Sequence, residues 1–323
     1  MLDSSPFRGY HHVTTCVGGA QADYDFHVKF LGLRCVKRTV LLDGEDPIYH
    51  LYYGNGDGAE GTIVTTFPMA HRPLGERGSG QVRTVSLAVP VGSLPFWRDR
   101  LERAGYAASP SERFGLLRLG FEHPAGISYE LVGVARDSRT PWTGADVPAA
   151  AAIRGIYGVT VAAADVGSAL RDYLRQVLRF GGEERDGQAY RFTVDGGAVG
   201  DDPSGRTLEV VEDRVRSQGT WGYRPGTVHH VALHIPDRPT QDRFKRHVEA
   251  LGFNDISEPK DRNYFQSLYW RTPAGALFEG AVTQEKGWLK DESPDELGRG
   301  LQLPERLIDR RDAIVARLEP IIG

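Results

Sequence analysis

Hydrophobic and polar residues follow one pattern four times along the chain. An apolar, strand-like run comes first, and a segment whose apolar residues recur at three- and four-residue spacing follows it, as on one face of a helix. The strand-like runs are 11–17, 83–90, 157–165 and 229–237. The helical segments are 21–32, 92–105, 165–179 and 240–252. Three of these segments end in glycine, which a helix C-terminus favours, so the pattern predicts a unit that opens with a strand and a helix.

The closing part of each unit also repeats. "HPAGISYELVG" at 123–133 and "TPAGALFEGAV" at 272–282 both place a PAG turn before an alternating strand that carries glutamate at the same offset. Looser copies are "SGRTLEVVED" at 204–213 and "AEGTIVTTFP" at 59–68. Each unit therefore reads as a strand, a helix and about three further strands, and four such βαβββ units fill roughly residues 9–284.

The units divide the chain into segments of different kinds. Residues 1–134 hold the first two units, and residues 153–284 hold the other two. The segment between them, 135–152, is rich in Thr, Pro and Ala, which favours a linker. We expect the tail, 285–323, to form a loop and then a charged helix near 304–318 that packs on the outside.

Composition narrows the class of protein. The 323 residues are 40% hydrophobic and 25% charged, which indicates a globular rather than a disordered chain. The net charge of −4 gives no reason to expect a nucleic acid or an anionic membrane as partner. The first residues lack an apolar signal-peptide core and no apolar run approaches a membrane span, so we expect a cytoplasmic location. Cys16 and Cys35 lie in apolar runs, which favours buried thiols over a disulfide.

Two positions of the repeat carry the residue types that bind metals. One is in the opening strand and the other is the glutamate position of the closing strand. In unit order, the residues at these two positions are His12 and Thr65, Thr84 and Glu130, Gly158 and Glu209, and His230 and Glu279. No single unit has a complete ligand set, but units one and four together supply two histidines and one glutamate.

His12, His230 and Glu279 form the ligand set known as the two-histidine, one-carboxylate facial triad. It holds three adjacent positions of an octahedral metal and leaves three open, which suits Fe(II) and dioxygen chemistry, and Mn(II) accepts the same ligands. A second histidine, His11 or His229, precedes each of the two ligand histidines. Since neighbouring residues on a strand point to opposite faces, strand parity predicts that His11 and His229 point away from the metal.

The four units and their paired ligands resemble the vicinal oxygen chelate superfamily of glyoxalases, bleomycin-resistance proteins and extradiol dioxygenases. The resemblance is closer to its para-hydroquinone and chlorohydroquinone 1,2-dioxygenases. The stretches that carry it are HHVTTCVGGAQADYDFHVKFLGLRCVKRTV, DGEDPIYHLYYGNGDGAEGTIVTTFP, GTVHHVALHIPD and RNYFQSLYWRTPAGALFEGAV. It implies an α+β fold of two open β-barrels, in which units one and four pair around the metal and units two and three pair without one. It also implies Fe(II) as cofactor, and a small aromatic substrate and O2 as partners.

The resemblance further places five side chains around the metal, and these are His11, Thr14, His229, Arg262 and Tyr269. His11 and His229 would serve as acid–base groups, Tyr269 would bind the substrate oxygen, and Arg262 would stabilise charge. For the two histidines this conflicts with strand parity. We favour the resemblance, because the twisted rim of a barrel can bring both faces near a metal. Asn263 follows Arg262 where the family has glycine, a difference that could alter the loop over the substrate.

Other activities of the superfamily compete with this interpretation. Catechol dioxygenases draw their ligands from the second half of the chain, and a ligand at His12 argues against them. A glyoxalase or other isomerase needs a second carboxylate where Thr65 stands, and a small-molecule binding protein has no use for the triad. Oxidative cleavage of another phenol stays open, as do the ring substituents, Fe(II) against Mn(II) and a homo-oligomeric state. His50, on a strand of unit one, is a further candidate for the cavity wall.

Overall fold

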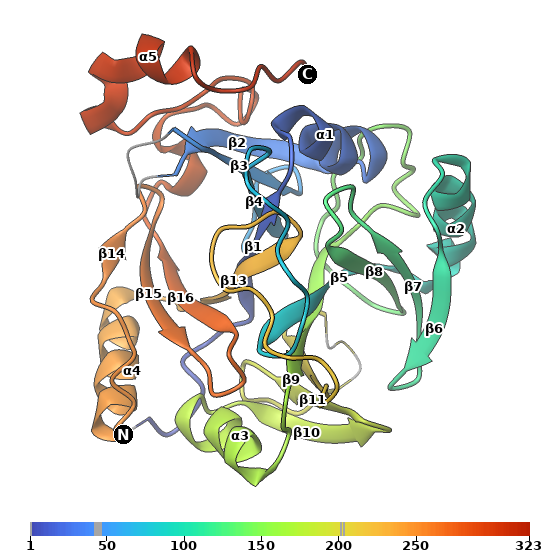
Figure 1. The fold of residues 1–323 in the computed structure, drawn as a ribbon, viewed down its shortest axis with the longest axis vertical. Helices are drawn as coiled ribbons and strands as arrows, with labels where there is room; N and C mark the ends of the chain where they lie inside the picture. Colours follow the sequence, from blue (N-terminus) through green and yellow to red (C-terminus); the bar gives the residue numbers. More distant parts are fainter. Residues whose placement is uncertain (1, 42–46, 201, 203) are drawn as a thin grey trace.

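Two curled eight-stranded sheets lie side by side, and each forms an open barrel (Figure 1). The computed structural model describes residues 2–41, 47–200, 202 and 204–323. Residues 43–46, which open one of the stretches that carry the family resemblance, lie outside this description. The α+β class and the paired open barrels predicted from the repeat are confirmed.

Each unit has the predicted order of one strand, one helix and three strands. Unit one contains β1 (Tyr10–Val17), α1 (Ala20–Tyr24), β2 (Arg34–Val40), β3 (Tyr49–Gly54) and β4 (Ile63–Pro68). Unit two contains β5 (Gln81–Pro90), α2 (Leu94–Arg103), β6 (Ser109–Arg113), β7 (Leu116–Glu122) and β8 (Ser128–Val134). Unit three contains β9 (Gly155–Ala163), α3 (Ser168–Asp172), β10 (Gly181–Asp186), β11 (Ala189–Thr193) and β12 (Thr207–Glu212). Unit four contains β13 (Thr227–His234), α4 (Arg238–Ala250), β14 (Lys260–Asp261), β15 (Phe265–Arg271) and β16 (Leu277–Thr283).

The order of strands in each sheet shows which units pair. One sheet runs β14-β15-β16-β13-β1-β4-β3-β2, and the other runs β10-β11-β12-β9-β5-β8-β7-β6. In the first, β1 and β13 meet antiparallel at the centre, and β5 and β9 meet the same way in the second. Units one and four therefore share one barrel and units two and three share the other, as predicted. Each barrel draws on both halves of the chain, and the division at 135–152 stays a prediction about the sequence units.

The predicted helices form close to their expected bounds. α1 and α3 each continue as a π-helical turn, Asp25–Phe30 and Tyr173–Val177, which a 3.6-residue apolar spacing does not reveal. Gly32, Gly105 and Gly252 follow three of the helical segments with φ of 73°, 79° and 87°. These left-handed values are open to glycine at little cost, which explains its place at the helix ends.

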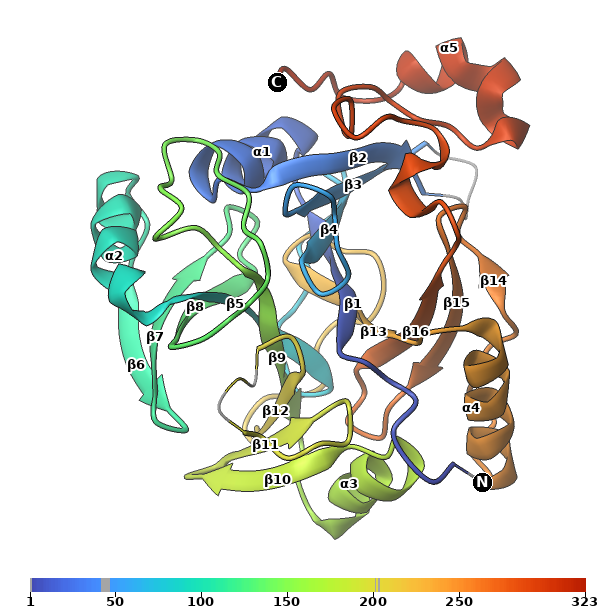
Figure 2. The same cartoon turned by 180° about the vertical axis from the view of Figure 1, so that it is seen from behind.

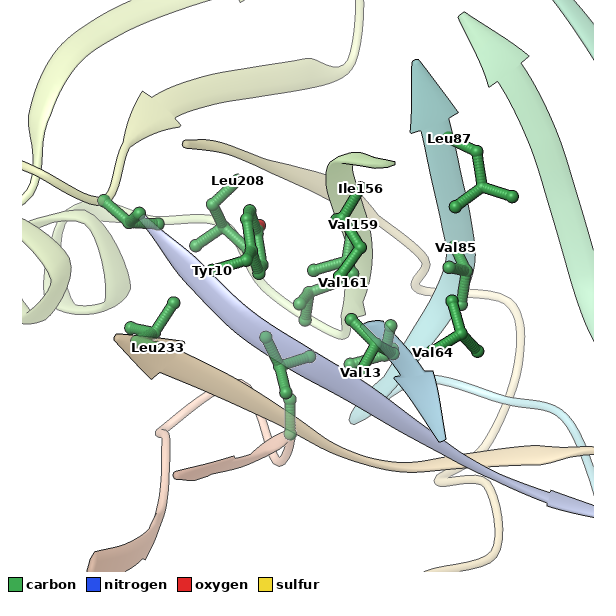
Figure 3. Close-up of a cluster of buried hydrophobic side chains, with 14 of the residues drawn as sticks. Tyr10, Val13, Val64, Val85, Leu87, Ile156, Val159, Val161, Leu208 and Leu233 are labelled. Carbon is green, nitrogen blue, oxygen red and sulfur yellow. The ribbon is translucent and has the colours of Figure 1, made fainter. Parts of the chain in front are cut away.

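Aliphatic and aromatic side chains fill the space between the two barrels (Figure 3). Tyr10 and Val13 of β1 point into this space together with Val159 of β9 and Val85 of β5, and all four are buried. The opposite face of each central strand is thereby left to line the inside of its own barrel. The core thus holds the two sheets together and leaves each barrel interior free for polar groups.

The tail packs against the outside of the first barrel near β2 (Figure 2). It contains 3-10 turns at Gly287–Lys290 and Glu305–Arg310 and the short helix α5 (Arg311–Val315). The carboxylate of Glu319 accepts hydrogen bonds from the first backbone N–H groups of α1. Among the described helices, none is both long and apolar enough to cross a membrane.

Both cysteines are buried free thiols, as predicted. Burial raises the pKa of Cys16 to about 12 and that of Cys35 to about 11. Because the thiolate is the reactive form, we expect neither thiol of the native protein to react with a disulfide reagent such as Ellman's reagent at pH 8. In guanidinium chloride two thiols per chain should react. Rapid labelling of the native protein would contradict the burial.

Candidate metal centre

Three buried ligand atoms converge inside the first barrel. Nε2 of His12 lies 3.1 Å from Nε2 of His230, and these two nitrogens lie 3.6 Å and 2.9 Å from Oε2 of Glu279. Adjacent ligand atoms of an octahedral metal with bonds of about 2.1 Å are about 3 Å apart. The three residues are at most 4% exposed. The spacing of these atoms therefore fits one metal ion at three adjacent positions.

The electrostatics of the group also fit a cation. Oε1 of Glu279 accepts a hydrogen bond of 2.5 Å from Ser267, whereas its buried Oε2 makes no hydrogen bond with the described residues. Burial acts to raise the pKa of Glu279, but His12 and His230 outweigh it and hold that pKa below its usual range. An ionised carboxylate thus faces two imidazole nitrogens. A bound metal would satisfy all three, since a buried unpaired charge is costly.

Strand register explains how residues so far apart in sequence meet. On neighbouring strands Glu279 lies opposite Ala232, and Ala232 lies opposite His12. In the next row Thr14 lies directly opposite His230. Cross-strand neighbours share a face of the sheet, so the three ligands project into the same barrel interior. The candidate ligand set of the sequence analysis is thereby brought together, and its role as a metal site is taken up below.

The second histidine of each pair does not follow strand parity. A β-bulge leaves His11 as the extra residue on β1 between Tyr10 and His12, and a second bulge leaves His229 as the extra residue on β13. Such bulges re-aim a side chain that regular alternation would turn away. Nδ1 of His11 lies 2.7 Å from Nδ1 of His12. Regular alternation therefore does not describe the two outer histidines, because each of them contacts its ligand histidine.

The two outer histidines nevertheless face different surroundings. His229 repeats the contact of His11, with its Nδ1 2.7 Å from Nδ1 of His230, but it also lines the cavity and stacks on Tyr223 at 4.3 Å between ring centroids. His11 lies behind His12, and its Nε2 contacts Thr283 instead. Burial lowers the pKa of His11 to about 4 and takes that of His229 well below its usual value, so both rings are neutral at pH 7.

A chain of polar side chains reaches the site from unit one. The Tyr52 hydroxyl lies 2.8 Å from Nδ1 of His50, and Nε2 of His50 lies 3.0 Å from the Thr65 hydroxyl. Thr65 is 2.7 Å from the Thr14 hydroxyl, which is 2.8 Å from Nε2 of His230. With Tyr52 as the first donor, each member donates to the next, and the Thr14 hydroxyl donates toward the candidate metal position.

Arg262 and Tyr269 meet above the candidate ligands. Nε of Arg262 donates a hydrogen bond of 3.1 Å to the Tyr269 hydroxyl, and its guanidinium lies 5.2 Å from the centre of that ring. Tyr269 in turn packs edge-on against His230 at 5.7 Å. Asn263, which follows Arg262, adopts a left-handed φ of 72° and accepts a hydrogen bond of 2.6 Å from Lys290. It thus takes a conformation that glycine would otherwise supply.

A cavity of about 220 Å³ opens above the site. All of the predicted site residues except His11, Thr14 and Glu279 contribute to its lining. The other lining residues, which include the open candidate His50, are Thr39, Val40, Leu41, His50, Tyr52, Phe67, Tyr223, Lys260, Asn263, Tyr264, Phe265 and Leu277. Most of these lie on strands that the repeat predicts without ranking one position over another. These residues lie on the same strand face as the candidate ligands, and that shared face was the signal that sequence reasoning could have used.

The second barrel holds a salt-bridge cluster in the matching place. The guanidinium of Arg118 lies 2.5 Å from Glu130 and 2.5 Å from Glu209, and it is fully buried. Arg113 approaches both carboxylates from the rim. The two glutamates at the repeat position of Glu279 are therefore neutralised by arginine. These ion pairs explain how two buried glutamates are tolerated in the second barrel without histidines beside them.

A second group of metal-ligand types occurs among the described residues, at Asp23, His27 and His123. Here Asp23 already accepts hydrogen bonds from Tyr53 at 2.8 Å and Thr66 at 2.6 Å, and His123 lies 3.2 Å away. The carboxylate is thus satisfied by side chains. This pattern is typical of a buried structural network.

Comparison with known proteins adds independent information. No family model matches the chain. The chain is 38% identical to a chlorohydroquinone/hydroquinone 1,2-dioxygenase of Sphingobium indicum over 98% of its own length and 97% of that protein. It is 35% identical to MhqO of Bacillus subtilis, a provisionally assigned ring-cleaving dioxygenase, over 97% of its own length and 96% of MhqO.

Solved structures agree with these relatives. A provisionally assigned dioxygenase from Bacillus subtilis superposes with a TM-score of 0.89 at 33% identity, covering 99% of both chains. Glyoxalase I from Zea mays superposes with a TM-score of 0.59 at 12% identity, covering 88% of this chain and 94% of that one, and shows the fold alone.

Proposed function

Because this chain belongs to the ring-cleaving dioxygenases of the vicinal oxygen chelate superfamily, we propose that it opens the ring of a para-dihydroxy aromatic compound with O2. The proposal places Fe(II) on His12, His230 and Glu279. The observation that carries it is the convergence of three buried ligand atoms below a cavity of the right size for a single substituted ring. The name of the Sphingobium relative supports hydroquinones as the substrate class.

The chemistry of the ligand set suits this reaction. Bound Fe(II) would lower the pKa of a coordinated phenol and leave open positions where substrate and O2 can meet. A para-hydroquinone has its hydroxyls on opposite sides of the ring, so only one oxygen can bind the metal. The second hydroxyl must then be held by the protein, which gives the cavity side chains their role.

We assign these roles from position. Phe67, Phe265 and Leu277 give the cavity apolar walls that would flank the ring and exclude water. Tyr269 and Arg262 would donate hydrogen bonds to substrate oxygens, because both line the cavity next to the ligand His230. Neutral His229, at the cavity wall, would take the proton that a hydroxyl releases. Thr14 would donate a hydrogen bond into the site beside His230.

The overall reaction needs no further reductant. The ring bond between a hydroxylated carbon and its neighbour breaks, and both oxygen atoms of O2 enter the product. O2 is reduced by four electrons, all of which come from the ring. The product is a ring-opened semialdehyde acid, or an acyl halide when the neighbouring carbon carries chlorine.

Oxygen uptake tests this proposal. With protein loaded with Fe(II) without air, hydroquinone and its methyl and chloro derivatives should each consume about one O2 per ring and give a new near-ultraviolet absorbance. Catechol serves as the matched control and should turn over much more slowly. A parallel sample loaded with Mn(II) decides between the two metals. Tightly bound iron without uptake on any hydroquinone would refute the substrate class.

A further inference from the structure

A line of hydrogen bonds leads from the candidate ligand His12 to the surface. Nε2 of His11 lies 3.1 Å from the hydroxyl of Thr283, and Thr283 donates a hydrogen bond of 2.7 Å to the carboxylate of Glu60. Thr283 ends β16, four residues after Glu279, whereas Glu60 is exposed in the loop before β4. Neither residue touches the cavity.

The carboxylate at the outer end fixes the direction of every bond in this line. An ionised Glu60 can only accept, so the single hydroxyl proton of Thr283 must point toward it. The Thr283 oxygen is then free to accept, and Nε2 of His11 must carry the proton that it receives. An imidazole with one ring proton, here on Nε2, has only a lone pair at its other nitrogen, Nδ1. Nδ1 of His12, 2.7 Å away, must therefore be the donor.

We propose that Thr283 and Glu60 are positioning residues that hold His12 in the tautomer with its proton on Nδ1. The Nε2 of His12 then has a lone pair directed at the metal position, where it lies 3.1 Å from Nε2 of His230. This inference rests on the proposed function for the role of His12 as a ligand. Hydrogen-bond partners behind a ligand histidine fix its tautomer and raise its basicity.

Without the hydrogen bonds from Thr283 and Glu60, His11 and His12 could exchange the roles of hydrogen-bond donor and acceptor between them. With no acceptor at Nε2, His11 can move its proton to Nδ1 and donate to His12. The proton of His12 would then sit on Nε2, in the way of the metal. His229, the partner of the other ligand histidine, shows no such anchor among the described residues and stacks on Tyr223 instead. The hydrogen bonds that fix a tautomer are therefore found behind His12 and not behind His230 among the described residues.

Thr283→Val tests the proposal, because valine keeps the shape of threonine and removes its hydroxyl. We expect Fe(II) affinity, measured without air by competition with a chromogenic chelator, to fall about 10- to 100-fold. Thr283→Ser restores a hydroxyl and should return the affinity to within about threefold of the wild type. Glu60→Ala, on the surface, should weaken binding in the same direction.

Nitrogen-15 NMR of the histidine rings gives a second readout on the metal-free protein. The wild type and Thr283→Ser should show His12 protonated on Nδ1 and His11 protonated on Nε2, whereas Thr283→Val should show mixed tautomers. Wild-type affinity together with an unchanged His12 tautomer in Thr283→Val would overturn the inference. Failure of the proposed function would give a different result. The wild type itself would then bind no iron or cleave no hydroquinone, whereas the NMR spectra would still show the expected tautomers in the wild type and in Thr283→Val.

Discussion

Glu279→Gln is expected to abolish iron binding and ring cleavage together. The substitution keeps the size of the side chain and the hydrogen bond from Ser267, but it removes the negative charge that faces His12 and His230. Fe(II) would then have a single neutral amide oxygen in place of a carboxylate. We expect activity to fall by more than about a hundredfold, since loss of a partner merely behind a ligand already costs 10- to 100-fold. Iron content after anaerobic loading and O2 uptake measure the two effects.

The second barrel provides the matched control for this experiment. Glu130 occupies the same repeat position as Glu279 but accepts hydrogen bonds from Ser86 and Arg118. Glu130→Gln should keep full iron content and full oxygen uptake. Thermal unfolding adds a readout without substrate, because a metal that binds only the folded state raises the midpoint of the wild type and not that of Glu279→Gln. Full iron content and activity in Glu279→Gln would refute the ligand assignment.

The sequence predicts the architecture and a candidate ligand set, because both follow from the repeat. Once the four units are aligned, the opening-strand and closing-strand positions select His12, His230 and Glu279 without any structure. That units one and four must pair follows from the same three residues. The strand order, with β1 beside β13, agrees with this deduction. A ligand set divided between distant units thus carries topological information that local propensities lack.

Strand parity failed where a bulge interrupts the strand. In each of the four opening strands an unpaired residue stands immediately before the repeat position, and these residues are His11, Arg83, Tyr157 and His229. The signal was present as core residues three apart rather than two, as in Tyr10 and Val13 of β1. A period of two assumes uninterrupted pairing, and the register of a partner strand cannot be read from one strand alone. The spacing of the core residues hints at an interruption, but the position of each bulge is defined only by the register of the paired strands.

The sequence also could not predict which side chains act on the candidate ligands through other residues. Nothing in the order of residues reveals that Thr283 and Glu60 stand in line behind His11, since they come from opposite ends of the chain. The same holds for part of the cavity wall, to which Tyr223 contributes from the loop before β13, outside the predicted strands. The left-handed backbone of Asn263, by contrast, agrees with the glycine that the family resemblance places there.

Arg118→Met is expected to destabilise the protein more than any change at its surface. Arg118 is fully buried, and its guanidinium lies between Glu130 and Glu209, at the place that the candidate metal position has in the first barrel. Methionine fills much of the volume but leaves two buried carboxylates, which among the described residues then keep ion pairs with Arg113 alone. Breaking such a buried cluster by removing one partner costs about 3–5 kcal/mol. The free energy of unfolding in urea, measured by circular dichroism, should fall by that amount.

Two further variants separate this electrostatic cause from loss of packing. Arg214→Met removes an exposed arginine that pairs with Glu212, and it should change the free energy of unfolding by less than about 0.5 kcal/mol. Adding Glu209→Gln to Arg118→Met removes one of the stranded charges and should recover part of the lost stability. If the double variant is no more stable than Arg118→Met alone, the loss comes from packing rather than from unpaired charge. In that case arginine does not take the place of a cation in the second barrel.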